Sequence, residues 1–307
     1  MPLRFGRQCA TAYPRTLSGM NYRHAFHAGN HADVLKHAAL LALCDALVAK
    51  PAPLFALDTH AGRGLYYLDA AQAKRTGEAS GGVGGIDRLQ PGTEPAPLRA
   101  YVDAITACRN AHGPNAYPGS PWLLTHALRA QDRITCCELQ PEEADALKSA
   151  MAGDARVAVH ARDGYGAMHA LLPPRIGEER FGRGLVLIDP PFEAQLQEFE
   201  TALRALRDAL ERWPQGTYAL WYPIKQRRAL QRAYRSMATM PAKSVMVAEL
   251  LVRPDDSPLR MNGSGLLLLN APYRFDQRMR ELLPVLADVL GEPTGAAWRV
   301  EWFKAPA

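Results

Sequence analysis

A short run, Asp189-Pro190-Pro191-Phe192, has the groups that recognition of an exocyclic amine on a nucleobase requires. It follows apolar residues at 184–188, which are typical of a buried strand in a parallel sheet. The two prolines prevent this strand from continuing as a regular ladder. The run therefore places a carboxylate, stiff backbone carbonyls and a flat ring at the carboxyl end of a strand, where open α/β sheets bind ligands. The oxygens can accept the two amine hydrogens, and the ring offers a surface for stacking.

Asp-Pro-Pro-Phe is also the signature of methyltransferases that act on such amines. A structural interpretation remains open, because a strand followed by a proline-stiffened loop has the same sequence. We expect Asp189 and the Pro190 carbonyl each to accept one amine hydrogen while Phe192 stacks on the base.

Acidic residues follow other apolar runs in the same way. Asp58-Thr59-His60-Ala61-Gly62-Arg63-Gly64 follows the run at 54–57, and Gly62 lets the backbone approach a ligand. Glu138 ends the run at 134–137, where an acid can accept ribose hydroxyls, and Asp163-Gly164 follows the run at 156–160, where an acid can accept an adenine amine. Each acid alone is equally well explained as a helix N-cap. Together they favour S-adenosylmethionine over a nicotinamide cofactor, since Tyr67 replaces the third glycine of GxGxxG.

The N-terminal part of the chain contains closely spaced histidines. His27 and His31 are four residues apart, but no cysteine or acid stands where it would complete a zinc site, so no metal is expected. We expect a loop leading to a helix from Asn30, with Lys36 and His37 directed toward the cofactor pocket. A solvated Lys36 is the alternative.

A rigid turn at 117–121 contains Ser120. Its hydroxyl either reaches the cofactor carboxylate or caps the helix that follows.

Four basic residues have spacings of three, four and three, which predicts one face of a helix: Lys225, Arg228, Arg232 and Arg235. Such a face suits a phosphate backbone. A charged face is more often only solvated.

The elements that position these residues alternate along the chain. Strands are predicted at 54–57, 134–137, 156–160, 185–188, 217–221, 245–252 and 265–269, and helices at 98–110, 141–151 and 195–212. Five strands that alternate with helices, followed by two strands joined directly, predict a parallel sheet that ends in an antiparallel hairpin. The interval between the first two strands is too long for one βαβ unit. We therefore expect a mostly helical insertion at 66–117, with the glycine-rich stretch at 81–85 as a flexible loop.

The composition limits the class of protein. Among 307 residues, 48% are hydrophobic and 22% charged, as in an ordinary globular protein. The net charge of +5 slightly favours polyanionic partners. Five cysteines without CxxC spacing indicate a reducing compartment, and no apolar run is long enough for a transmembrane helix. Residues 1–19 lack the apolar core of a secretory signal and are expected to be a disordered extension, with the folded domain at 20–307.

Taken in order, these segments resemble the RlmJ-type 23S ribosomal RNA adenine-N6 methyltransferases. The resemblance runs from Met20 to about Phe303 and is carried by Tyr-Arg-His-x-Phe-His-Ala-Gly-Asn-His-Ala-Asp-Val-Leu-Lys-His, Leu-Asp-Thr-His-Ala-Gly-x-Gly, Tyr-Pro-Gly-Ser-Pro, Ile-Asp-Pro-Pro-aromatic and Tyr-Ala-Leu-Trp-Tyr-Pro. It implies an α/β, Rossmann-like class I S-adenosylmethionine-dependent methyltransferase fold. We expect a seven-stranded, mostly parallel sheet with one antiparallel strand and a small helical insertion.

The resemblance also implies methylation of the exocyclic amine of a specific adenine in 23S ribosomal RNA. It implies Asp189 as the catalytic acceptor and Tyr22 at the substrate adenine. The cofactor contacts that it implies are Lys36, His37, His60, Ser120, Glu138, Asp163 and Gly164. The expected substrate is protein-free RNA or an early assembly intermediate, in the cytoplasm, with no membrane and no obligate protein partner. Phe192 is a departure, since the family often has Tyr there.

Two alternatives stay open. A DNA adenine methyltransferase shares this site chemistry, although no separate sequence-reading domain is visible. A non-catalytic RNA-binding protein that holds the cofactor is the other, although it leaves the complete Asp-Pro-Pro-Phe motif unexplained.

Overall fold

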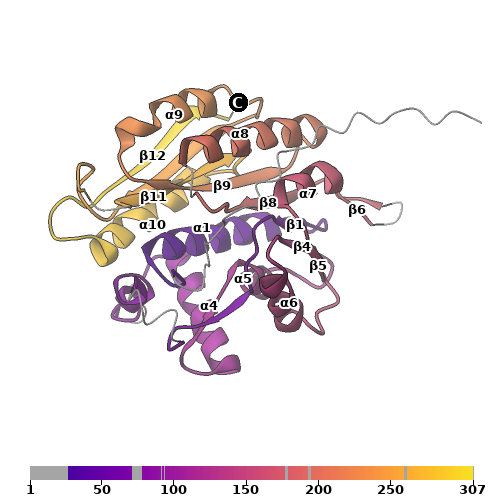
Figure 1. Cartoon of the computed structure of the whole chain (residues 1–307), viewed down its shortest axis with the longest axis horizontal. Helices are drawn as coiled ribbons and strands as arrows, with labels where there is room; N and C mark the ends of the chain where they lie inside the picture. Colours follow the sequence, from indigo (N-terminus) through magenta and orange to yellow (C-terminus); the bar gives the residue numbers. More distant parts are fainter. Residues whose placement is uncertain are drawn as a thin grey trace, which may run out of the picture.

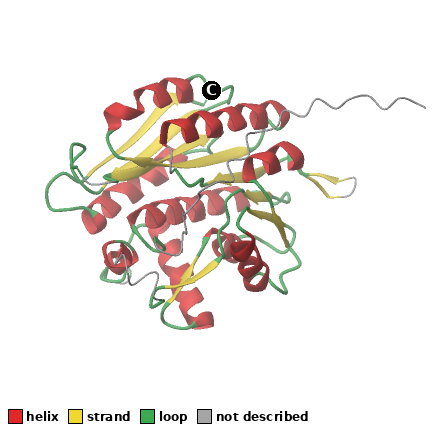
Figure 2. Ribbon diagram, in the orientation of Figure 1, coloured by secondary structure: helices red, strands yellow, loops and turns green. Residues whose placement is uncertain are grey.

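The computed structural model describes residues 27–70, 78–90, 92, 94–176, 179–192, 195–258 and 261–306, and an eight-stranded sheet forms its centre (Figure 1 and Figure 2). The strand order is β12-β10-β11-β9-β8-β1-β4-β5. The bounds are β1 Phe55–Asp58, β4 Arg133–Glu138, β5 Val157–Ala161, β8 Gly184–Ile188, β9 Thr217–Ile224, β10 Val245–Leu251, β11 Gly263–Leu269 and β12 Ala297–Lys304. Within the described residues, β11 and β12 run opposite to the other six strands of this sheet.

The predicted α/β class with a mostly parallel sheet is confirmed. The predicted count of seven strands with one antiparallel strand is wrong, because the described sheet has eight strands and two of them, β11 and β12, are antiparallel to the rest. The eighth strand, β12, pairs with β10 and forms an edge of the sheet as far as the described residues go. An edge strand is not buried on all sides, so charged residues such as Arg299 and Glu301 interrupt its apolar ones. β12 therefore lacks the continuous apolar run that identifies the buried strands.

Helices cover both faces of the sheet (Figure 1). One apolar core packs α1, α4, α5, α6 and α10 together, and the other packs α7, α8 and α9. Along β1 the side chains alternate between the two, with Ala56 in the first core and Phe55 and Leu57 in the second. The helix bounds are α1 His31–Val48, α4 Ala96–His112, α5 Ser120–Ala127, α6 Pro141–Ala150, α7 Gly164–Leu171, α8 Gln195–Arg212, α9 Gln231–Ala238 and α10 Phe275–Leu290.

A short two-stranded ribbon encloses another group of elements in the order of the chain. β2 (Leu65–Tyr67) pairs antiparallel with β3 (Ala116–Pro118), and η2 (Glu78–Gly81), α3 (Val83–Ile86) and α4 lie between them in the chain. The flexible loop expected at 81–85 is instead the end of η2 and most of α3. Its glycines allow close packing, because a Cβ at Gly82 would lie 2.0 Å from the carbonyl oxygen of Gly29. A hairpin of β6 (Arg175–Ile176) and β7 (Glu179–Arg180) precedes β8.

The sheet order changes direction next to β1. The chain passes from β1 to β4 and β5 on one side, and then returns to β8 and β9 on the other. The carboxyl ends of β1 and β8 therefore flank a topological switch point, where α/β sheets bind ligands. Among the described residues, no helix is both long and apolar enough to span a membrane. The expected extension at 1–19, and Tyr22, lie outside the described residues.

Candidate active site

The carboxyl ends of four neighbouring strands bring the predicted acids to one edge of the sheet. Asp189 directly follows β8, Glu138 is the last residue of β4, and Asp163 follows β5 by two residues. Asp58 ends β1, between them in the sheet order. Because these strands are parallel, their ends meet at the same edge.

Asp189 is held by a lysine from α1. The Lys36 Nζ donates to Asp189 Oδ2 at 2.5 Å and to Asp33 Oδ1 at 2.8 Å. The Lys36 side chain is only 5% exposed, so a solvated lysine is excluded. Burial lowers the pKa of Lys36, but the carboxylates of Asp189 and Asp33 outweigh it and hold that pKa well above its ordinary value.

The start of α1 fixes the position of this lysine. As expected, the helix begins after Asn30, whose side chain caps it by accepting from the N–H groups of Ala32 and Asp33, both at 3.0 Å. Asp33 also accepts from the Gly29 N–H at 2.9 Å. The acid that pairs with Lys36 is thus itself fixed by backbone contacts.

Asp58 is a site residue that sequence reasoning did not select. Its side chain is fully buried, and burial raises its pKa to about 7. The Ser120 hydroxyl and Lys36 oppose this rise, whereas Asp189 adds to it. The signal was present in the sequence, since Asp58 stands at its strand end as the other acids do at theirs.

The glycine turn after β1 contacts the acid at the end of β4. Gly62 has φ +59°, which favours glycine, and its N–H donates to Glu138 Oε2 at 2.9 Å. The Gln140 N–H donates to the other oxygen of Glu138 at 2.7 Å. Burial raises the pKa of Glu138. A carboxylate has about four lone-pair sites, so Glu138 keeps acceptor capacity for an incoming hydroxyl.

Asp163 and Gly164 form the turn into α7. Asp163 is the N-cap of α7 and accepts from the Gly166 N–H at 2.6 Å, as the structural interpretation of this acid expects. Gly164 lies against the turn after β1, because a Cβ there would be 2.1 Å from the Thr59 carbonyl oxygen. This contact requires glycine.

His60 is held beside these turns. Its Nδ1 lies 2.8 Å from the Thr59 hydroxyl, and its ring meets Tyr165 edge-on at 5.2 Å. Burial lowers the pKa of His60 to about 4. The imidazole is therefore neutral at physiological pH.

The remaining predicted cofactor residues, His37 and Ser120, lie on α1 and at the start of α5. His37 is buried, with Nδ1 2.9 Å from the Tyr117 hydroxyl, which lies 2.9 Å from that of Tyr101. Ser120 is the first residue of α5, and Gly119 is the N-cap. Ser120 therefore does not cap the helix, and its hydroxyl acts on Asp58 instead.

Phe192 is part of an aromatic wall beside Asp189. Its ring lies 4.9 Å from that of Phe199 on α8 and 5.9 Å from that of Trp221 on β9. Trp221 was not selected from the sequence, although it belongs to the Tyr-Ala-Leu-Trp-Tyr-Pro run on the strand next to β8.

The four predicted basic residues do not share one helix, so that prediction is wrong. Lys225 lies on a bend after β9, Arg228 lies in η3 (Arg227–Leu230), and Arg232 and Arg235 lie in α9. All four are exposed. Arg232 pairs with Glu200 of α8 at 2.8 Å.

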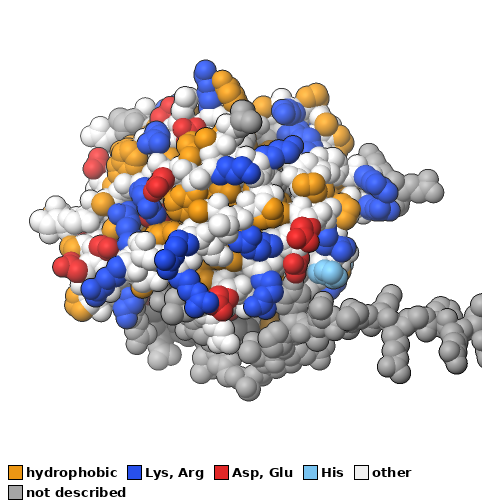
Figure 3. All heavy atoms as spheres, turned by 90° about the horizontal axis from the view of Figure 1, so that it is seen from above, with side chains coloured by type: hydrophobic (Ala, Val, Ile, Leu, Met, Phe, Trp, Pro, Cys, Tyr) orange, Lys and Arg blue, Asp and Glu red, His pale blue; other side chains and the backbone are white. Residues whose placement is uncertain are grey.

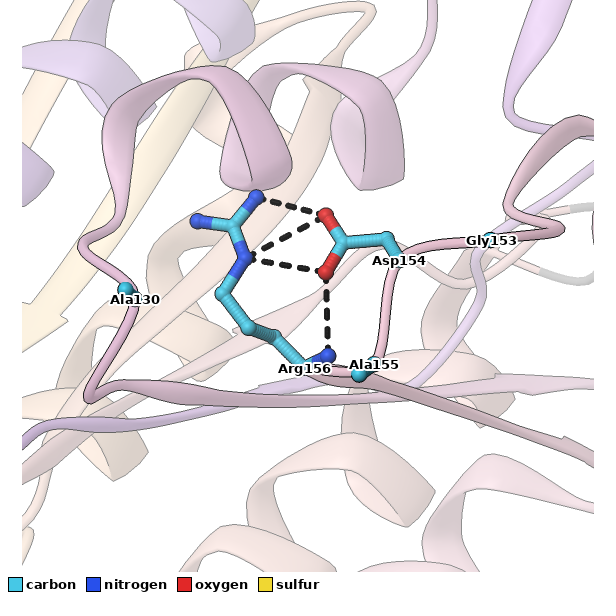
Figure 4. Close-up of a pocket in the computed structure, with 5 residues that line it drawn as sticks. All are labelled: Ala130, Gly153, Asp154, Ala155 and Arg156. Carbon is cyan, nitrogen blue, oxygen red and sulfur yellow. Dashed lines mark hydrogen bonds and ion pairs between the residues drawn. The ribbon is translucent and has the colours of Figure 1, made fainter.

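A shallow depression of about 580 Å³ lies elsewhere, lined by Ala130, Gly153, Asp154, Ala155 and Arg156 (Figure 4). It is at the amino ends of β4 and β5, away from the acids. Arg156 is occupied there by Asp154 and by the carbonyl groups of Thr125 and Leu128. These contacts are structural. Among the described residues, no group of three or more His, Cys, Asp or Glu side chains is arranged to hold a metal ion.

Known ribosomal RNA methyltransferases resemble this chain over most of its length. The family model described as "Ribosomal RNA large subunit methyltransferase D, RlmJ" matches residues 51–304. "Ribosomal RNA large subunit methyltransferase J" of Haemophilus influenzae is 37% identical over 287 residues, covering 92% of this chain and 99% of that protein. The Escherichia coli K12 protein of the same name is 36% identical over 285 residues, with the same coverage. The crystal structure of protein LPL1258 from Legionella pneumophila matches with a TM-score of 0.77 and 32% sequence identity. The match covers 90% of this chain and 98% of the Legionella chain. The resemblance inferred from the motifs is confirmed, and this chain belongs to the RlmJ family of ribosomal RNA large subunit methyltransferases.

Proposed function

We propose that this chain transfers a methyl group from S-adenosylmethionine to the exocyclic amine of one adenine in 23S ribosomal RNA. The observation that carries the proposal is the position of Asp189, which stands at the switch point of the sheet, is fixed by Lys36 and follows a strand that leads into Phe192. Membership of the RlmJ family supports the choice of ribosomal RNA.

The adenine amine is a poor nucleophile because its lone pair is delocalised into the ring. Asp189 and the Pro190 carbonyl each accept one of its hydrogens, which directs the lone pair out of the ring system. Asp189, or a water molecule behind it, then takes the released proton. Lys36 stays protonated and so cannot be the base. Its role is to hold the acceptor carboxylate in place.

The aromatic wall receives the base. A base leaves its stack at a cost of a few kcal/mol, which is least for an unpaired nucleotide. Stacking on an aromatic ring returns about 1–3 kcal/mol per base. Phe192 supplies this surface, and Trp221 and Phe199 hold its ring from two sides.

The turns around the acids fit the cofactor. Gly62, with positive φ, and Gly164, packed on Thr59, keep the backbone at this edge free of side chains. Glu138 keeps lone pairs for the ribose hydroxyls, and Asp163 for the adenine amine. The remaining contacts are assigned to His37, His60 and Ser120. When bound, S-adenosylmethionine supplies a methyl group on a positively charged sulfur.

Basic residues at the same edge suit the RNA. Lys225 and Arg228 follow β9, the strand next to β8, and Arg232 and Arg235 continue along α9. The face that carries α8 and α9 shows Lys and Arg side chains spread among apolar ones (Figure 3). We propose that protein-free RNA or an early assembly intermediate binds here, and that Tyr22 contacts the target adenine.

Labelled S-adenosylmethionine tests the proposal. The protein is incubated with protein-free 23S ribosomal RNA or with duplex DNA, and the label is mapped by digestion. One N6-methyladenine in the RNA and none in the DNA is the expected result. Label in DNA alone would identify a DNA adenine methyltransferase, and label in neither would identify a non-catalytic protein.

A further inference from the structure

Two buried tyrosine hydroxyls and one histidine nitrogen form a chain of hydrogen bonds that links the helical insertion to α1. The hydroxyl of Tyr101 on α4 lies 2.9 Å from that of Tyr117 on β3. The Tyr117 hydroxyl in turn lies 2.9 Å from the Nδ1 of His37 on α1. Both tyrosines are fully buried and His37 is 1% exposed, so no bulk water competes for these bonds.

The arrangement of the buried protons fixes the direction of this chain. Among the described residues, the Tyr101 hydroxyl has no hydrogen-bond partner other than Tyr117. Burial raises the pKa of both tyrosines, so each hydroxyl keeps its proton. If Tyr117 donated to Tyr101, the buried Tyr101 proton would lack an acceptor, which is unfavourable. Tyr101 therefore donates to Tyr117, and Tyr117 donates to the Nδ1 of His37.

We infer that Tyr117 and Tyr101 hold His37 with its proton on Nε2, as a hydrogen-bond donor to the cofactor. In a neutral imidazole one nitrogen donates and the other accepts, and the partner of one nitrogen sets the tautomer. An Nδ1 that accepts from Tyr117 leaves the proton on Nε2. A doubly protonated imidazole would have to donate from Nδ1, which would reverse both hydrogen bonds and leave the Tyr101 proton without an acceptor. The same chain therefore disfavours a charged His37.

Tyr117 and Tyr101 are thus positioning residues for S-adenosylmethionine. The inference rests on the proposed function, which assigns His37 to the cofactor, and it names the group that the histidine offers. The carboxylate and ribose oxygens of the cofactor accept hydrogen bonds, so an Nε2–H matches them and a bare nitrogen does not. His37 directly follows Lys36, whose Nζ holds Asp189 at 2.5 Å. Through Tyr101 of α4, the helical insertion takes part in cofactor recognition.

The tautomer of His37 can be measured directly in the full chain. The protein is labelled with ¹⁵N-histidine, and long-range ¹H–¹⁵N correlation spectra distinguish an Nε2–H from an Nδ1–H imidazole. The spectrum of His37→Gln, which lacks the His37 signals, assigns them. The unaltered chain should show the Nε2–H tautomer, and a proton on Nδ1 overturns the inference. Tyr117→Phe removes only the donor to Nδ1 and should give a mixture of both tautomers.

Calorimetric titration with S-adenosylhomocysteine tests whether cofactor affinity depends on this tautomer. Tyr117→Phe should weaken binding about tenfold, which corresponds to about one hydrogen bond. Tyr101→Phe leaves the Tyr117 donor in place and should weaken binding by less than about threefold. Tyr218→Phe is the matched control and should bind as the wild type. Tyr218 is also fully buried, but its hydroxyl donates to the carbonyl groups of Ala209 and Trp213 in the other core.

Wild-type affinity in Tyr117→Phe, or a loss no greater than that in Tyr218→Phe, overturns the inference. If Tyr117→Phe does not fold, the spectrum of the unaltered chain decides. Addition of S-adenosylhomocysteine should then shift the Nε2 signal of His37, and an unchanged Nε2 signal refutes the contact. The proposed function is judged separately, by whether the unaltered chain methylates 23S ribosomal RNA.

Discussion

The Nζ of Lys36 and the Oδ2 of Asp189 lie 2.5 Å apart, although 153 residues separate them in the chain. Lys36 lies on α1, and Asp189 directly follows β8. The pair is therefore formed only in the folded protein, and it fixes the acid that the proposed reaction needs. Asp33, at 2.8 Å from the same nitrogen, completes a triad in which Lys36 and Asp33 are buried and Asp189 is partly exposed.

Replacing Lys36 by Met should remove activity and destabilise the fold. Asp33, which is buried, and Asp189 would lose their common cation, and removal of one partner of a buried pair costs about 3–5 kcal/mol. Misplacing Asp189 by about 1 Å costs on the order of 100-fold in rate. Urea unfolding and single-turnover methylation measure the two effects. Lys36→Arg, which keeps the charge, should retain more stability; a Lys36→Met protein of normal rate would rule out this role.

Phe192→Ala should raise the KM for RNA without changing the affinity for the cofactor. Loss of a stacking ring costs about 1–3 kcal/mol per base, or roughly five- to 150-fold in the KM for RNA. Phe192→Tyr keeps the ring and serves as the control, with near-normal kinetics. An unchanged KM for RNA in Phe192→Ala would mean that the base stacks elsewhere.

Gly62→Ala should reduce cofactor affinity through crowding as well as strain. Its Cβ would lie 2.2 Å from the Tyr66 hydroxyl, and its φ is +59°. Gly153 has φ +93° with nothing within 4 Å of a Cβ, so Gly153→Ala shows the effect of strain alone. Calorimetric titration with S-adenosylmethionine compares them. If both variants bind equally well, the close approach at Gly62 has no part in cofactor binding.

Asp58→Asn should change how stability depends on pH. The pKa of Asp58 is about 7 in the folded protein, against its ordinary value of 3.8, which applies in the unfolded chain. Below pH 4 both states hold the proton, but between pH 4 and 7 the unfolded state releases it first, so wild-type stability falls as pH rises. The loss is on the order of 4 kcal/mol. Denaturation at several pH values measures the free energy of unfolding of both proteins. Between pH 4 and 7 the value for Asp58→Asn should rise relative to that of the wild type. A difference that does not change with pH would contradict the buried, protonated acid.

Strand ends were the most predictable part of the site. Asp189, Glu138 and Asp163 follow strands that are recognisable as apolar runs, and parallel strands must place their carboxyl ends together. The N-terminus of α1 was also predictable, because Asn30 is a strong cap.

Contacts between distant segments were not predictable. The sequence does not show that Lys36 meets Asp189, since that depends on how α1 packs on the sheet. Trp221 sits in an ordinary buried strand, and only its contact with Phe192 distinguishes it. The basic residues were misassigned to one helix because spacing cannot reveal the bend at Lys225 and the 3₁₀ turn of η3.

The most direct test of the proposed chemistry is Asp189→Ala, assayed for cofactor affinity and for methylation of 23S ribosomal RNA. Removing the acceptor should lower the single-turnover rate by about 10²–10⁴-fold. Affinity for S-adenosylmethionine should change by less than about threefold, because Glu138 and the glycine turn remain. Asp145→Ala, at an acid that is 75% exposed on α6, is the control and should behave as the wild type. An Asp189→Ala protein that methylates the RNA at the wild-type rate would contradict the role of this acid.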